Sequence, residues 1–173
     1  QIEGNGQESI ALCCDFLAWR LALAKEMKSH CSLERRRTEL LRHHNAAWLN
    51  IWSSISAYYY ALLGESEKIP PIFGEHRLSD INMLAPGRPM MLLIENQVYL
   101  AQENYAKVIG RSDGQLSVCE GMHYRLVALH IRIQTAAAYE AMGKWQEAEQ
   151  MLTQAILEAE TDYLMLPFVE NYR

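Results

Sequence analysis

Three tyrosines stand at nearly equal intervals along the chain, at positions 60, 99 and 139, and each lies four positions before an expected turn. A repeat of about 40 residues has room for two helices and their turns, so it favours one helical hairpin in each unit. Hairpins of this kind stack side by side, because no single hairpin can bury its own apolar face. The tyrosine and turn pairs are Tyr60 with Gly64, Tyr99 with Glu103, and Tyr139 with Gly143.

The helical pattern is clearest in the segments 122–142 and 144–159. Apolar residues in 144–159 follow steps of three and four, which places them in one stripe on a helix. The segment 122–142 carries two such stripes, which is typical of a helix packed between neighbours. Gly143 separates the two helices, and so short a linker makes them antiparallel partners. The stripe of 144–159 consists of Trp145, Ala148, Met151, Leu152, Ala155, Ile156 and Ala159.

The same analysis predicts further helices upstream and breaks between them. Prolines at positions 70 and 71 stop a helix, and residues of about 74–88 form a loop rich in Gly and Pro. We therefore predict an all-α fold, a superhelix of antiparallel helix pairs with about seven or eight helices. The upstream helices are expected at about 6–28, 37–62, 89–102 and 104–110.

Composition and charge bear on the partners. Half of the chain is hydrophobic and 21% is charged, which is the composition of a folded domain. The net charge of −5 does not suit binding to nucleic-acid phosphates, so we expect no nucleic-acid contact by this chain. The one dense basic run, Arg35 to Arg37, is interpreted as a solvated first helical turn, with a patch for a partner as the alternative.

Cysteine usage and hydropathy indicate the compartment. The four cysteines have no CxxC spacing and no secretory signal precedes them, so we expect reduced thiols in a cytoplasmic protein. No stretch of 18 apolar residues occurs, so we expect no membrane contact. The chain begins without an initiator methionine and ends within an apolar strip, 164–173, which can pair two copies into a homodimer. We expect 1–173 to be a single helical-repeat domain of a larger protein, with 164–173 beginning the connection to a further domain.

Catalytic and metal-binding chemistry finds little support. Cys119, His123 and His130 could line up on one helix, but no fourth ligand is evident and Gly121 falls between the first two. No nucleophile elbow or phosphate-binding loop is present, and the carboxylates lie on expected helix surfaces. We therefore expect no enzyme activity, no metal site and no cofactor.

Aromatic residues are the candidate ligand-binding groups. Consecutive tyrosines at 58–60 span more than half a helical turn, so we expect at least one to face a concave groove or solvent, where it could stack on a ligand. Packing between helices is the alternative for these side chains, and also for the neighbouring pair at positions 124 and 125. The predicted groove for a ligand or partner comprises Tyr59, Tyr60, Tyr99, Tyr124 and Arg125.

The unit 124–160 resembles a tetratricopeptide repeat. It departs from the pattern at Glu160, where the repeat usually has proline. The resemblance implies structural roles for Tyr139, Gly143, Trp145, Ala148 and Ala155, and Ala138, Leu152 and Ile156 also match.

A second resemblance covers most of the chain and is most specific towards its C-terminal end. After the repeat helix comes Leu166-Pro167-Phe168-Val169-Glu170-Asn171. This is similar to the region upstream of the DNA-binding domain in large bacterial LuxR-type regulators of the MalT kind, where a segment like MPF-x-EN follows a repeat helix. Also matched are Tyr105, the run 137–144, Glu147-Ala148 and the run 155–159.

The resemblance implies a parent protein with an ATPase domain before this segment and a helix-turn-helix domain after it. This segment would then sense a small-molecule inducer or a regulatory protein and relay its binding to both domains. DNA would be bound by the C-terminal domain and not by this chain. The alternative function is a tetratricopeptide-like scaffold for protein–protein interaction, whose groove receives a peptide.

Overall fold

The computed structural model describes residues 38, 46–75 and 88–171. Within these ranges the chain forms seven α-helices and one 3-10 helix, and no strand, which confirms the predicted all-α fold. The predicted helix at 6–28 lies outside the described residues. The elements are α3 (Ala46–Leu62), η1 (Ser66–Lys68), α4 (Pro71–Gly74), α5 (Arg88–Ala101), α6 (Tyr105–Gly121), α7 (Arg125–Ala141), α8 (Trp145–Glu160) and α9 (Leu166–Asn171).

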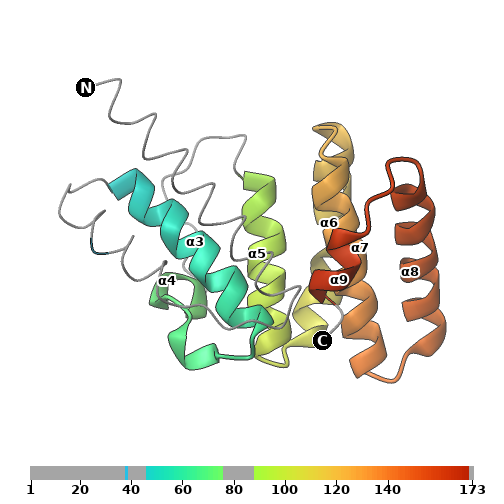
Figure 1. The fold of residues 1–173 in the computed structure, drawn as a ribbon. Coiled ribbons are helices and arrows are strands. Elements are labelled where there is room, and N and C mark those ends of the chain that lie inside the picture. Colours follow the sequence, from blue (N-terminus) through green and yellow to red (C-terminus); the bar gives the residue numbers. More distant parts are fainter. Residues whose placement is uncertain (1–37, 39–45, 76–87, 172–173) are drawn as a thin grey trace.

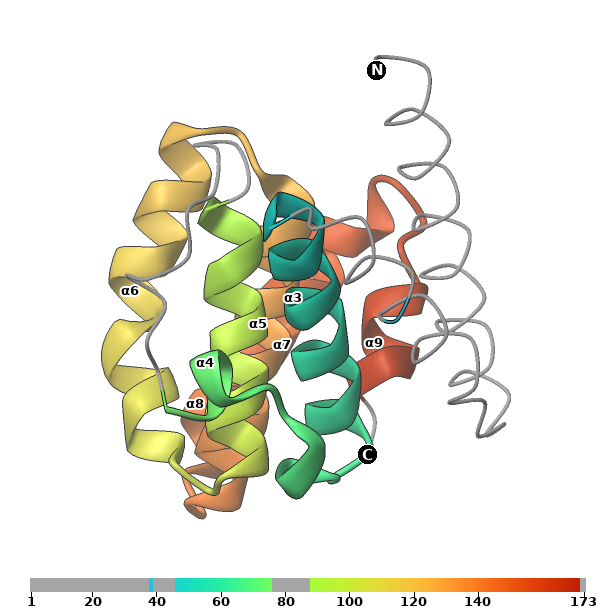
Figure 2. The same cartoon turned by 90° about the vertical axis from the view of Figure 1, so that its left-hand side faces the viewer.

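The helices pack mainly against their neighbours in the chain (Figure 1). Helix α5 contacts α3, α6 and α7, and α7 in turn contacts α6, α8 and α9. Figure 2 shows α6 on one side of α5 and α7, with α9 on the other side. Helices α5 and α7 are therefore covered on both sides, which explains the two apolar stripes of α7: ten of its residues are buried.

The same backbone turn ends five of the helices. After α3, α5, α6, α7 and α8 one residue has a positive φ, and the next amide donates a hydrogen bond to the carbonyl five residues back, at 2.8–3.1 Å. This arrangement is a Schellman motif, which satisfies the last carbonyls of a helix. The residues with positive φ are Gly64, Glu103, His123, Gly143 and Tyr163.

These turns explain the period seen in the sequence. The last four fall at the evenly spaced positions 103, 123, 143 and 163, so each repeat contains two helix-and-turn units. Tyr60, Tyr99 and Tyr139 share one structural position, because their carbonyls accept the closing hydrogen bond of the turn. The side chains also share a surrounding, since a Lys or Arg lies 5.3–5.9 Å from each ring centre.

Helix α6 is much longer than the expected 104–110, and that prediction was wrong. The helix runs from Tyr105 to Gly121 without a break at Gly110 or Gly114, both of which are exposed. Each internal glycine costs about 1 kcal/mol relative to alanine. Burial of Val108, Leu116 and Cys119 on the opposite face of the helix offsets that cost. The other helix ends that fall within the described ranges agree with the sequence to about three residues.

The turn after α7 gives a test of this backbone geometry. Gly143 has φ +72°, and a Cβ there would meet no atom within 4 Å, so Gly143→Ala adds backbone strain alone. We expect it to lower the free energy of unfolding by about 1 kcal/mol, measured by urea denaturation. His123→Gly, at φ 59°, should change the stability in the opposite direction by less than about 1 kcal/mol.

The control for this prediction is Gly114→Ala in the middle of α6. A Cβ at Gly114 also meets no atom within 4 Å, but the backbone there is helical, so alanine should stabilise by about 0.5–1 kcal/mol. Equal effects of Gly143→Ala and Gly114→Ala would contradict the left-handed turn.

Candidate functional site

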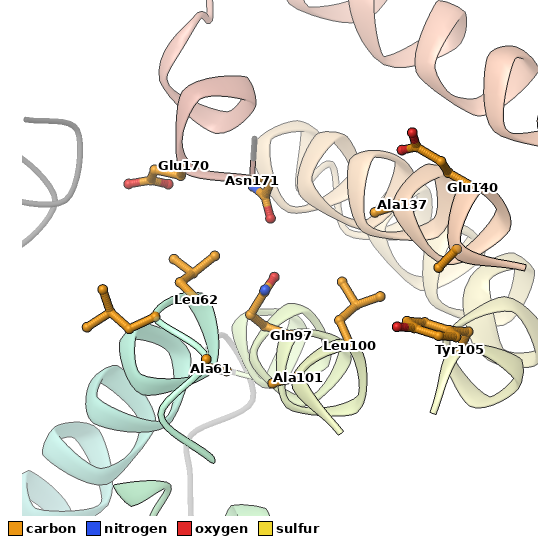
Figure 3. Close-up of a pocket in the computed structure, with 13 residues that line it drawn as sticks. Ala61, Leu62, Gln97, Leu100, Ala101, Tyr105, Ala137, Glu140, Glu170 and Asn171 are labelled. Atoms are coloured by element: carbon orange, nitrogen blue, oxygen red, sulfur yellow. The ribbon is translucent and has the colours of Figure 1, made fainter. Parts of the chain in front are cut away.

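A cavity of about 550 Å³ opens between the ends of α3 and α5 and the helices α7 and α9 (Figure 3). Its walls are mostly apolar and small, which leaves room for a ligand between the helices. The lining residues are Ala61, Leu62, Leu63, Gly64, Gln97, Leu100, Ala101, Tyr105, Ala137, Glu140, Ala141, Glu170 and Asn171.

Two side-chain amides face each other across this cavity. In Figure 3, Gln97 of α5 and Asn171 of α9 point toward one another, whereas Glu140 and Glu170 point away from the centre. The ring of Tyr105 forms a side wall. The polar groups directed into the cavity are therefore uncharged, which suits a neutral ligand better than an ionic one.

Gln97 is held by a buried neighbour on α7. The side-chain nitrogen of Gln134, which is fully buried, donates to Gln97 Oε1 at 3.1 Å and to the carbonyl of Leu93 at 2.9 Å. These bonds fix the orientation of Gln97 and occupy its oxygen. The amide NH₂ of Gln97 then remains as a hydrogen-bond donor at the cavity.

Asn171 presents the complementary group. Its Nδ2 donates to the carbonyl of Pro167 at 2.7 Å and lies 3.4 Å from Nδ1 of His130. Its Oδ1 is buried and has no hydrogen-bond partner in the described part of the chain. A buried acceptor without a partner costs about 1–3 kcal/mol, so a donor on a ligand would be favoured there. Together the two amides match a ligand that has a donor and an acceptor, such as a carboxamide or a peptide group.

Gln97 belongs to a run of three buried polar residues, 95–97, in an otherwise apolar helix. Each of the three has a different partner: Glu95 pairs with Arg111, Asn96 with Gln115, and Gln97 with Gln134. These contacts tie α5 to both α6 and α7. The polar run is the sequence signal that could have indicated Gln97.

Burial and charge change the pKa values of two groups near these contacts. Burial raises the pKa of Tyr99, the Glu95 carboxylate raises it further, and the neighbouring Arg111 partly offsets both effects. Burial also raises the pKa of Cys119, which lies fully inside the fold as a free thiol. The other three cysteines lie outside the described residues.

The predicted groove residues do not line this cavity. Tyr59, Tyr60 and Tyr99 are buried in the core, and Tyr124 is half-buried. Arg125 is exposed, with its Nη1 3.3 Å from Oδ2 of Asp162. The structure does not bring the five together at one surface.

All three consecutive tyrosines, 58–60, are buried, so the expectation that at least one would face a groove or solvent was wrong. The reason is that α3 is covered from more than one direction. The ring of His130 in α7 lies 6.4 Å from that of Tyr58, and Lys68 of η1 lies 5.9 Å from the ring of Tyr60.

The predicted repeat positions of α7 and α8 differ in how deeply they are buried. Ala155 is fully buried and Gly143 forms the turn, while Tyr139 and Ala148 are half-buried. Trp145 is 65% exposed. The predicted stripe of α8 is thus only partly covered, at the end nearer its C-terminus.

Comparison with known proteins gives no relative: no family model, curated protein or solved structure matches the chain. Among the described residues, no group of His, Cys, Asp and Glu is arranged to hold a metal ion. None of the helices within those residues has the length and apolar character needed to cross a membrane.

Proposed function

We propose that the chain is a sensor and coupling domain that binds a neutral, amide-like group of an inducer or a regulatory protein in the cavity between Gln97 and Asn171. The observation that carries this proposal is the pairing of a fixed donor on α5 with a buried acceptor on α9, across a cavity with no charge directed into it. A ligand that satisfies both amides binds α5 and α9 at once.

Helix α9 is the element that would relay binding. Phe168 of α9 and Leu164, two residues before the helix, pack against the small core cluster of α7 and α8 that contains Ala155 and Ala159. A ligand that bridges the two amides stabilises this docked position of α9 over any other. Its binding free energy is then coupled to whatever follows α9 in the chain.

The biological setting rests on the resemblance to LuxR-type transcriptional regulators of the MalT kind. In that setting α9 leads toward a helix-turn-helix domain, and the chain itself is neither an enzyme nor a DNA-binding module. The alternative is a tetratricopeptide-like scaffold that accepts an extended peptide in the same cavity. A peptide that binds much more tightly than a single amide would favour this alternative.

Side-chain amide resonances of the ¹⁵N-labelled protein test the proposal, with N-acetylalanine amide as the probe. We expect the Gln97 and Asn171 resonances to shift on titration, and amide hydrogen exchange in α9 to slow. The variant Gln97→Met should lose the shift of the Asn171 resonance and the slowed exchange in α9, while Gln150→Met on the exposed face of α8 should keep all of these effects. Unchanged binding in Gln97→Met would rule out the site.

A further inference from the structure

A second hollow, which we call the α7–α8 groove, adjoins the first cavity and shares Ala137, Glu140 and Asn171 with it. It has a volume of about 870 Å³ and lies between α7 and α8, with Phe168 of α9 at one end. Trp145, Leu152 and Ile156 of α8 and Ile133 and Ala137 of α7 are among its lining residues. The groove is distinct in chemistry from the first cavity, because large apolar side chains dominate its surface.

The apolar residues on the α8 side are exposed. The exposed fractions are 65% for Trp145, 40% for Leu152 and 44% for Ile156. Their spacing of seven and four residues puts them in one stripe along the helix. A contiguous apolar patch of this kind marks an interaction surface more often than a solvated one.

The occupied end of the groove shows what kind of element fits. Leu164 lies just before the short helix α9, and Phe168 lies within it. Both pack against the cluster formed by Leu129, Ile133, Ala155 and Ala159. Ile133 belongs both to this interface and to the open groove. The open part is therefore a continuation of a surface that already accepts a helix, and a helix is the element that fits between α7 and α8.

The charge around the groove selects the partner. Glu140 and Glu149 line its two sides, and neither has an ion-pair partner among the described residues. Other carboxylates of this region are paired, as Glu158 is with Arg132 at 2.8 Å. Between 125 and 171 there are seven acidic and three basic side chains, so the groove is an acidic surface with an apolar floor.

We propose that the α7–α8 groove binds an amphipathic α-helix of a partner protein, with apolar residues at helical spacing on one face and Lys or Arg beside them. Apolar anchors would cover Trp145, Leu152 and Ile156, and the basic residues would pair with Glu140 and Glu149. A second copy of the chain fits less well, because it would bring the same unpaired carboxylates to the contact.

The probe is a fluorescein-labelled synthetic helical peptide of five turns, with leucines on one face and lysines flanking them. Its matched control has the same leucines with glutamates in place of the lysines. Fluorescence anisotropy should give binding at least about tenfold tighter for the lysine peptide, and the difference should shrink with added salt. Equal binding of the two peptides would contradict the proposed charge selection.

Two exposed residues of α8 provide matched variants. Trp145→Ala should weaken binding of the lysine peptide at least about tenfold, as expected for an aromatic anchor. Leu157→Ala, at a side chain that is 61% exposed and outside the groove, should leave binding unchanged. Both positions are exposed, so both variants should keep the wild-type melting temperature. Equal binding by the two variants would place the peptide elsewhere and overturn the proposal.

Charge reversal and self-association complete the test. The variant Glu140→Lys/Glu149→Lys should prefer the glutamate peptide, and retention of the original preference would contradict the role of these two residues. Sedimentation equilibrium tests the second copy as occupant. If the wild-type protein is a dimer that Trp145→Ala converts to a monomer, the groove is a self-association surface, and the proposal of a basic partner helix fails.

Discussion

Replacement of Arg111 by methionine is expected to lower the free energy of unfolding by about 3 kcal/mol or more. Its guanidinium forms an ion pair with Glu95, whose side chain is only 8% exposed, and lies 5.3 Å from the Tyr99 ring centre. Removing one partner of such a pair leaves a buried charge without compensation, which typically costs about 3–5 kcal/mol. Urea denaturation at neutral pH measures the loss.

Two further variants separate the buried charge from the packing of the arginine. The double variant Glu95→Leu/Arg111→Met should recover most of the stability, because it removes both charges. Arg125→Met breaks an ion pair whose side chains are 62% and 51% exposed, and should cost less than about 1 kcal/mol. A loss in Arg111→Met as small as that in Arg125→Met would show that Glu95 is not buried as described.

The second large effect is expected at the amide pair between α5 and α6. Asn96 and Gln115 exchange two hydrogen bonds of 2.7 and 3.1 Å, and both residues are buried. Asn96→Leu removes these bonds and leaves the Gln115 amide without a partner, which should cost about 2–3 kcal/mol. The measurement is again the free energy of unfolding in urea.

The double variant Asn96→Leu/Gln115→Leu is the decisive comparison. With both amides gone, the unpaired Gln115 amide of the single variant is removed, so the double variant should be more stable than Asn96→Leu alone. The control Gln154→Leu, at an exposed residue that accepts a 3.4 Å hydrogen bond from Arg132, should cost about 0.5 kcal/mol or less. A double variant no better than the single one would show that the amides do not interact directly.

The helical repeat could be predicted from the sequence because its turns recur at a regular interval and favour particular residue types. The interval from Tyr99 to Tyr139 is the distance between two equivalent turns, and Gly143 is the residue type that a positive φ favours. His123 and Tyr163 also adopt a positive φ, but neither histidine nor tyrosine predicts this conformation. The single helix-and-turn unit was therefore not visible in the sequence. In α6 the reverse happened, because the expected helix ended at about 110, whereas Gly110 and Gly114 are both helical.

The candidate site was much harder to predict than the fold. Sequence reasoning favoured aromatic side chains, yet Tyr59 is wholly buried and the cavity presents Gln97 and Asn171 instead. An amide in a helix looks like a solvent-facing residue unless its partner is known. The partners of Gln97 and Asn171, Gln134 and His130, lie 37 and 41 residues away, so only the folded chain brings them together.

The even spacing of the turns also constrains how such a chain can change in length. Neighbouring helices run in opposite directions. The residues just before α6, α7 and α8 supply no side-chain hydrogen bond to the helix start, so each of these turns is closed by backbone hydrogen bonds. Insertion or loss of a complete helical hairpin would therefore preserve the direction of every later helix. Loss of one helix with its turn would reverse the direction of every later helix and turn the amide of Asn171 away from Gln97. Viable length variants of this domain should differ by whole hairpins and never by one helix.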